Sequence, residues 1–358
     1  MKKFFKAIII IVIFGILFFL GFSYKDEIII FLGTTKVEME NYFEIDSDPI
    51  YTEKQIEEIL LADDKKINRE FTGKLDTYYY DQLDIYSKLI YKSILNNIDK
   101  LIIGNCEIEL SNSLSNIMQK ENGKEEINLA FQNAWSAFRI DHPEVFYINI
   151  KNVYLTTKTI TIGKKIKYEF YLNSKEQNDF DNIINAKNFV DQKKDDIINT
   201  LNNSNNTSTK ILNVHDWLVD NLKYDVTAKK ANNSNIYGAI VENEAICEGY
   251  AKAFKYILDN LDIPCIIVCG EVVDEDGIRQ KHAWNEVYLK GNWYCIDVTW
   301  DDPIIIGGGK LTKELRYKYF MKGSRTINEN HFQNGRISDD ENEIEFKYPI
   351  LSVDDYKK

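Results

Sequence analysis

Residues 245–301 hold three short motifs that decide the fold: AICEGYA at 245–251, KHAWNEV at 281–287 and WYCIDVTWD at 293–301. The first motif opens an apolar pattern at helical spacing, so it predicts a helix that begins at Cys247. The other two motifs are rich in β-branched and aromatic residues and flank a short turn, which predicts a β-hairpin. With a third strand in the buried apolar run before them, the order indicates an α+β fold.

Three residues of these motifs have the chemistry of a nucleophilic site. Cys247 lies at the predicted start of a helix, where free N–H groups and the helix dipole stabilise a thiolate by ~0.3–1 kcal/mol. His282 can serve as the base, and Asp297 can orient its ring and stabilise the imidazolium. Each residue alone is typical of an ordinary core or surface position. Their combination on a helix start and two following strands predicts a Cys-His-Asp site.

The register of the hairpin bears on whether His282 and Asp297 can meet. A two-residue loop at Gly291 and Asn292 would pair Glu286 with Asp297. His282 would then point to the same face but lie ~13 Å along the strand. Contact would require a bulge or a different register, so the spacing alone leaves the contact open.

The three motifs resemble those of the transglutaminase-like superfamily, in its bacterial branch close to kyphoscoliosis-peptidase-type domains. The resemblance covers residues 211–303 and implies a papain-like fold in which Cys247, His282 and Asp297 are in contact. It also implies that Cys247 attacks an amide carbonyl to form a thioester, with His282 as the base and then the acid. An amine acceptor gives crosslinking and water gives hydrolysis, so a cysteine acyltransferase and a cysteine peptidase both stay open. No cofactor and no metal are expected.

The same resemblance implies that the oxyanion is held by the backbone N–H of Cys247 and one side-chain donor. Tyr237, ten residues before the cysteine, is the candidate donor, and Trp217 is the alternative. Trp284 follows His282 by two residues and is expected to line either the substrate cleft or the core.

The first 24 residues predict a membrane anchor. Three lysines precede an uncharged run of 18 residues at 7–24, which as a helix would span about 27 Å, close to the ~30 Å hydrocarbon core. Positive charge before the run keeps the N-terminus in the cytoplasm and sends the rest outward. We therefore expect a single-pass protein of the cell membrane with an extracellular catalytic domain. A cleaved signal peptide is the alternative.

The chain divides into four expected segments. Residues 1–24 form the cytoplasmic N-terminus and transmembrane helix, and residues 25–73 form a stalk. Residues 74–202 form an accessory α+β region with mixed helices and strands, and residues 203–358 form the catalytic domain. The polar stretch NNSNNTST at 202–209 marks the boundary between the last two segments.

Charge and composition narrow the class of partner. The net charge of −12, from 44 Lys+Arg and 56 Asp+Glu, argues against nucleic acid, which requires a basic face. The five cysteines show neither a disulfide framework nor a CxxC pair for zinc. The expected partner is a protein or peptide substrate, associated with the cell wall. A non-catalytic cell-surface binding module of the same fold is the competing hypothesis, and the intact set of three residues favours the enzyme.

Only four histidines are available for imidazole chemistry. His215 lies on an apolar helical stripe and is expected in the core, and His142 lies at a helix end before Pro143. His331 lies in a polar stretch near the tail, where no partner is visible in the sequence. His282 is therefore the expected base.

Overall fold

The computed structural model describes residues 47–64, 77–148, 152–162, 164–175, 180–201, 205–303, 311–337 and 343–357. Two compact units are distinguished, one of residues 1–49 with 158–169 and one of residues 50–157 with 170–358. In the first unit, the backbone N–H of Tyr168 donates to Oδ2 of Asp48 at 2.6 Å. The helices and strands that carry the candidate site all lie in the second unit.

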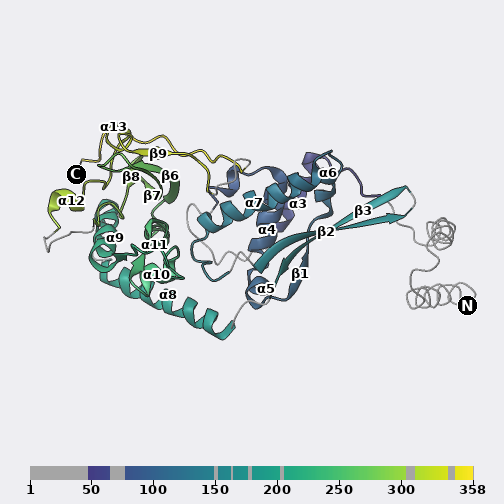
Figure 1. The fold of residues 1–358 in the computed structure, drawn as a ribbon, viewed down its shortest axis with the longest axis horizontal. Helices are drawn as coiled ribbons and strands as arrows, with labels where there is room; N and C mark the ends of the chain where they lie inside the picture. Colours follow the sequence, from purple (N-terminus) through teal and green to yellow (C-terminus); the bar gives the residue numbers. More distant parts are fainter. Residues whose placement is uncertain are drawn as a thin grey trace, which may run out of the picture. The chain divides into compact units, whose positions relative to one another are not determined.

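The N-terminal part of the second unit is mainly helical (Figure 1). Its long helix α7 ends at Asp141, directly before His142-Pro143, because proline cannot continue a helix. Helix α4 begins after Asp84, whose side chain accepts from the N–H groups of the first turn. The helices are α3 (Glu53–Asp64), η1 (Tyr80–Gln82), α4 (Ile85–Leu95), α5 (Ile98–Ile103), η2 (Asn112–Leu114), α6 (Ser115–Met118) and α7 (Gly123–Asp141).

Three strands form a small sheet with the order β1-β3-β2. They are β1 (Cys106–Glu109), β2 (Val153–Ile162) and β3 (Lys165–Ser174), and β1 is antiparallel to β3. The sequence is rich in β-branched and aromatic residues over the last two of these strands.

Four helices build the core beneath the candidate site. They are α8 (Phe180–Leu201), α9 (Thr207–Asn221), α10 (Ile236–Ile240) and α11 (Cys247–Asp259). Val190 of α8, Leu218 of α9 and Phe254 of α11 share one apolar cluster with the strands that follow. Helix α11 begins at Cys247, as the sequence predicts.

The four-stranded sheet is antiparallel with the order β8-β7-β6-β9. Its strands are β6 (Cys265–Val273), β7 (Arg279–Leu289), β8 (Asn292–Ile296) and β9 (His331–Gln333), and two short helices, α12 (Lys313–Arg316) and α13 (Ser324–Ile327), precede β9. Helix α11 packs against β6 and β7 (Figure 1). Asn285 of β7 reaches from this face to α11 and donates to the carbonyl of Ala251 at 3.0 Å. The mixed helical and antiparallel architecture confirms the predicted α+β class.

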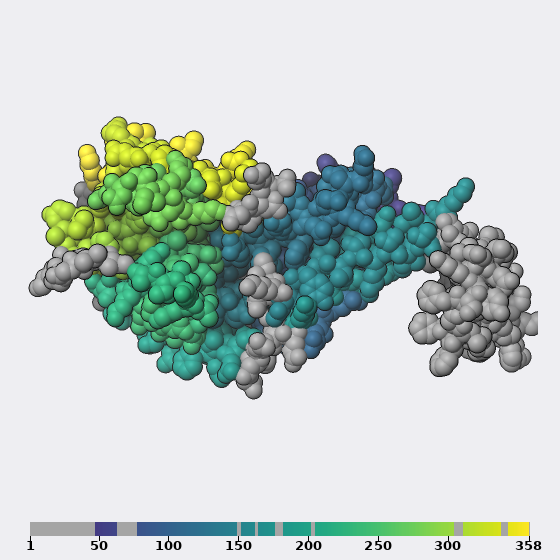
Figure 2. Space-filling model, in the orientation of Figure 1, coloured from purple at the N-terminus to yellow at the C-terminus, as the bar shows by residue number. Residues whose placement is uncertain are grey.

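The C-terminal segment 343–352 contacts both helix α7 and the four-stranded sheet. Figure 2 colours this segment yellow. At one end, the N–H of Ile344 donates to Oδ1 of Asn133 in α7 at 3.0 Å. At the other end, the N–H of Ser352 donates to the carbonyl of Trp293 in β8 at 2.8 Å. The segment therefore links α7 to β8 through hydrogen bonds donated by its own backbone N–H groups.

The predicted membrane anchor lies outside the described residues. Among the residues that the structure describes, no helix combines the length and the apolar character needed to cross a membrane. The run at 7–24 and the residues around it therefore stay a prediction.

Candidate active site

Cys247 is the first residue of α11 and is partly exposed. Ile246 at the N-cap offers no side-chain hydrogen bond to the first turn. Gly249 lies against the chain behind it, because a Cβ built there would overlap the carbonyl oxygen of Asn233 and the Cβ of Ala245. The glycine thus allows this segment to pack against the first turn, and the cysteine side chain is presented at the positive end of the helix dipole.

Two other short elements meet next to this helix start. Strand β5 (Glu244–Ala245) leads directly into Ile246 and pairs in parallel with β4 (Lys223–Tyr224). Tyr224, the last residue of β4, lies opposite Ala245. The pairing therefore brings Tyr224 to the edge of the site.

His282 and Asp297 are in direct contact, since Nε2 of His282 lies 2.7 Å from Oδ2 of Asp297. The hairpin register explains this contact, and the expected pairing of Glu286 with Asp297 is wrong. Glu286 lies opposite Cys295 instead. Asp297 follows the last residue of β8 and therefore comes level with Trp284, two residues from His282. Side chains at this diagonal offset reach one another without a bulge.

The turn chemistry accounts for the shifted register. Leu289 pairs with Asn292, so the two loop residues are Lys290 and Gly291. Both have positive φ, 51° for Lys290 and 88° for Gly291. Positive φ at both central residues is typical of the type I′ turn, whose twist suits a two-residue hairpin.

The side chain of His282 is hydrogen-bonded to both Cys247 and Asp297. Burial lowers the pKa of His282, but the charge and hydrogen bond of Asp297 and the hydrogen bond to Cys247 outweigh it and raise the pKa to about 10. Because Nε2 is taken by Asp297, Nδ1 is the nitrogen left for the sulfur. The arrangement therefore favours the imidazolium form of His282.

The Asp297 side chain is fully buried and fully engaged. Its Oδ1 accepts the N–H of Trp300 at 3.1 Å, and its Oδ2 accepts from both His282 at 2.7 Å and His331 at 3.0 Å. Burial raises the pKa of this carboxyl, but the two imidazoles outweigh burial and hold the pKa well below its ordinary range. Asp297 therefore stays charged inside the protein.

A second buried histidine–aspartate pair holds the loop after Asp297. The N–H of Asp301 donates to the carbonyl of Asp297 at 3.1 Å. Nε2 of His215 lies 3.0 Å from Oδ2 of Asp301, and the side chains of both residues are fully buried. His215 is therefore buried, and its pair with Asp301 anchors the loop to α9.

A cavity of about 380 Å³ opens beside His282. Its walls include Tyr224, Trp300, Asp302 and Tyr319. Burial raises the pKa of Tyr224, and the charges of Cys247 and Asp225 add to this, so the hydroxyl remains a hydrogen-bond donor. Sequence reasoning missed Tyr224, because β4 is only two residues long and carries no periodic pattern.

The three aromatic residues named from the sequence do not line this cavity in the described part of the chain. Tyr237 lies on α10 with its ring 6.0 Å from that of Phe146, and Trp217 of α9 packs on the same apolar core. Trp284 is 2% exposed, and its ring stacks on His282 at 6.1 Å. Trp284 therefore supports the histidine from behind.

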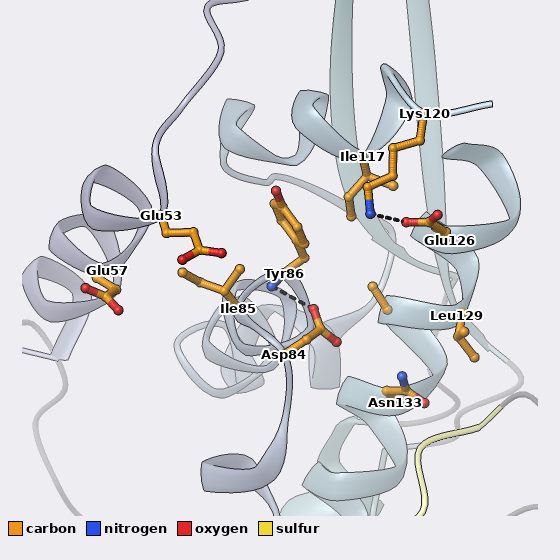
Figure 3. Close-up of a pocket in the computed structure, with 11 residues that line it drawn as sticks. Glu53, Glu57, Asp84, Ile85, Tyr86, Ile117, Lys120, Glu126, Leu129 and Asn133 are labelled. Atoms are coloured by element: carbon orange, nitrogen blue, oxygen red, sulfur yellow. Dashed lines mark hydrogen bonds and ion pairs between the residues drawn. The ribbon is translucent and has the colours of Figure 1, made fainter. Parts of the chain in front are cut away.

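A larger cavity of about 590 Å³ lies between the N-terminal helices. Figure 3 shows Glu53 and Glu57 of α3 on one side and the Lys120–Glu126 ion pair on the other, with Tyr86 between them. Among the described residues that line it, none is a cysteine or histidine. The chemistry of the chain therefore points to the smaller cavity.

His331 is a second residue that the sequence interpretation missed. The sequence shows no partner for it, but in the structure it is buried and bonded to Asp297. The two residues are 34 positions apart, and only the pairing of the short strand β9 with β6 brings them together. No local pattern in the sequence signals this contact. His282, Asp297 and His331 also place three potential metal-binding atoms within 4.8 Å of one another.

Comparison with known proteins agrees with these observations. Residues 195–298 match the family model described as the transglutaminase-like superfamily. Kyphoscoliosis peptidases of Mus musculus and Homo sapiens are each 24% identical over 131 residues, which cover 34% of this chain and 20% of the relative. The chain thus matches a fifth of the length of these relatives.

Two solved structures are also similar to the chain, each at 15% identity. One, described as a TGase, has a TM-score of 0.29 and covers 48% of this chain and 50% of its own. The other, described as a "Putative Cysteine Protease from Cytophaga hutchinsonii", has a TM-score of 0.27, with 42% and 63% covered. The match to the family model includes Cys247, His282 and Asp297. Residues 195–298 of the chain therefore form a transglutaminase-like domain.

Proposed function

We propose that the protein is a cysteine enzyme that transfers or hydrolyses acyl groups at the amides of proteins or peptides. The observation that carries this proposal is the position of the His282 ring, which bonds Asp297 through Nε2 at 2.7 Å and meets the Cys247 sulfur on its other side. A nucleophile, a base and an orienting carboxylate in this order are the requirements for acyl transfer through a covalent intermediate.

The reaction would proceed in two stages. The Cys247 sulfur attacks the carbonyl carbon, and the imidazolium of His282 gives its proton to the leaving amine as the C–N bond breaks. The resulting thioester is then attacked by water or by a second amine. The neutral His282 takes the proton from this nucleophile, and the C–S bond breaks to release the acyl product and free the Cys247 sulfur. Asp297 remains charged throughout and stabilises the imidazolium at each stage.

The negative oxygen that forms in each stage needs donors. One donor is the backbone N–H of Cys247, because this residue lies in the first turn of α11, where N–H groups have no partner within the helix. We assign the second to the hydroxyl of Tyr224, because it lines the cavity together with His282 and its pKa responds to the charge of Cys247.

Tyr224→Phe is expected to lower kcat by about 100-fold with little change in KM, the loss typical of one oxyanion donor. Steady-state kinetics on a glutamine-containing peptide would measure this. Tyr237→Phe is the matched control, because the sequence resemblance favours Tyr237 and the structure places it on the core cluster. A larger loss for Tyr237→Phe than for Tyr224→Phe would contradict the assignment.

The proposed reaction is tested by incubating the full chain with a glutamine donor peptide, with and without a primary amine. We expect a thioester on Cys247 by mass spectrometry, and none in Cys247→Ser. Incorporation of the amine would identify a transferase, and release of ammonia in both samples without incorporation would identify a hydrolase.

The competing hypothesis, a non-catalytic binding module of the same fold, makes the opposite prediction. In that case Cys247 would react with iodoacetamide no faster than an ordinary thiol below pH 8, and replacing His282 would change nothing. Three other thiols do not compete, because burial raises their pKa values, to about 12 for Cys269 and well above the ordinary range for Cys265 and Cys295.

We also propose that the enzyme is held in the cell membrane by residues 7–24, with its catalytic domain outside and cell-wall-associated proteins or peptides as substrates. The uncharged run and the lysines before it support this placement.

A further inference from the structure

His331 is a buried histidine that the mechanism above does not use. It opens β9, lies opposite Val272 of β6, and is 3% exposed. Its Nε2 lies 3.0 Å from Oδ2 of Asp297, the same oxygen that accepts from His282 at 2.7 Å. Two imidazoles thus share one carboxylate oxygen.

The other nitrogen of His331 is held as well. Nδ1 lies 2.7 Å from Oδ1 of Asn330, whose amide nitrogen donates to the hydroxyl of Tyr319 at 3.1 Å. The rings of Trp284 and Trp300 each lie 5.0 Å from that of His331, and Tyr319 lies at 5.2 Å. An imidazole enclosed in this way has one orientation, which points Nε2 at the carboxylate.

We propose that His331 is a positioning residue for the reaction, a role that rests on the proposed function of Cys247 and His282. The terminal torsion of an aspartate is broad, so a carboxylate needs fixed donors to hold one orientation. Oδ1 of Asp297 is fixed by the N–H of Trp300, and His331 fixes Oδ2 while one lone pair remains for His282. His331 thereby keeps the carboxylate aimed at the catalytic ring.

Two features separate this role from substrate binding and from metal binding. His331 is not among the described residues that line the cavity beside His282, so it acts through Asp297. The three side chains could in principle chelate a metal ion, but 2.7 and 3.0 Å are the distances of N–H donors to a carboxylate oxygen. A metal would require both donated protons to leave.

Two variants distinguish the hydrogen bond from the shape of the ring. His331→Gln keeps a donor and loses the ring, and His331→Phe keeps a ring and loses the donor. The probe is iodoacetamide, and the measurement is the rate at which Cys247 of the full chain is alkylated between pH 5 and 9, read by peptide mass spectrometry.

We expect His331→Phe to slow alkylation at pH 6 by about 10- to 100-fold, the factor of one hydrogen bond to a charged group. His331→Gln is expected to stay within about threefold of the wild type, because its amide can donate to the same oxygen. Wild-type behaviour of the Phe variant with a loss in the Gln variant would show that only ring shape matters and would overturn the proposal. Should the Phe variant not fold, His331→Ala is the donor-free comparison.

Further measurements distinguish a failure of the proposed function from a failure of the positioning role. His282→Ala must slow alkylation, and if it does not, the proposed function fails whatever His331 does. If His282→Ala slows alkylation while the donor-free His331 variant matches the wild type, only the positioning role fails. One equivalent of zinc retained by dialysed wild-type protein and lost from His331→Gln would also overturn the proposal, in favour of a metal site.

Discussion

Asp297→Asn is expected to lower kcat/KM by roughly 10³- to 10⁴-fold while the fold is kept, as when the carboxylate of a catalytic triad becomes an amide. The carboxylate accepts from two imidazoles and one backbone N–H, and an amide of the same shape offers only one oxygen and no charge. His282 would then lose both its orientation and the charge that stabilises its imidazolium.

The same substitution is expected to change the titration of His282. With Asp297 in place the pKa is raised to about 10, so the ring contributes stability that is complete below pH 6.5 and is lost as the pH rises through about 10. Without the carboxylate, burial is opposed only by Cys247, so the pKa falls and this contribution becomes smaller. NMR titration of the His282 ring in both proteins measures the change.

Asp195→Asn is the matched control, because Asp195 lies on α8 with a mostly exposed side chain and pairs only with neighbouring Lys194 among the described contacts. It should leave both kcat/KM and the titration of His282 unchanged. A wild-type titration in Asp297→Asn would show that another group holds the proton on His282.

Glu286→Gln is expected to stabilise the protein above neutral pH, and this is the largest effect on stability that we predict. The side chain of Glu286 is fully buried, its Oε1 accepts from Gln333 at 2.5 Å, and its Oε2 has no hydrogen-bond partner in the described part of the chain. Burial raises the pKa of this carboxyl from 4.5 to about 8, although the bond from Gln333 opposes the rise. The native state therefore keeps a proton that the unfolded chain releases.

The sign of the pH dependence follows from this difference. The stability linked to the Glu286 proton is complete below pH 4.5 and is lost as the pH rises to about 8, by roughly 5 kcal/mol in all. Glu286→Gln lacks this loss, so its free energy of unfolding should overtake that of the wild type as the pH rises. Urea denaturation at pH 5, 7 and 9 compares the two proteins.

The control for this measurement is Glu275→Gln, since that side chain is 91% exposed and its ion pair with Lys318 lies at the surface. Exposed ion pairs contribute about 0–1 kcal/mol, so the control should follow the wild type at each pH. Parallel pH curves for Glu286→Gln and the wild type would mean that Glu286 is ionised in the native state.

The sequence was sufficient to predict the helix start at Cys247, the strand that carries His282 and the strand that ends directly before Asp297. Apolar periodicity and the stop at Pro264 define these elements locally. The register was not predictable in the same way, because Gly291 fits either position of a two-residue turn. The structure places Lys290 in the left-handed region, which non-glycine residues adopt infrequently.

The residues that sequence reasoning missed are those set by distant pairing. Tyr224 belongs to a strand of two residues, and its place depends on the segment before Cys247. His331 opens a strand of three residues at the edge of the sheet, and it lies beyond the region that matches the family model. Contacts of this kind depend on the tertiary structure. Strands of two or three residues are too short to show an alternating pattern of apolar residues in the sequence.

The late position of His331 also sets an order of events during synthesis. The ribosome adds about 5–20 residues per second, so the 34 positions between Asp297 and His331 correspond to roughly two to seven seconds. During this interval the nascent chain already contains Cys247, His282 and Asp297, but not His331, the second imidazole bonded to the carboxylate. Segment 343–352, which joins α7 to β8, is made later still. A ribosome-bound chain therefore carries the three reacting residues before the parts that fix their geometry exist.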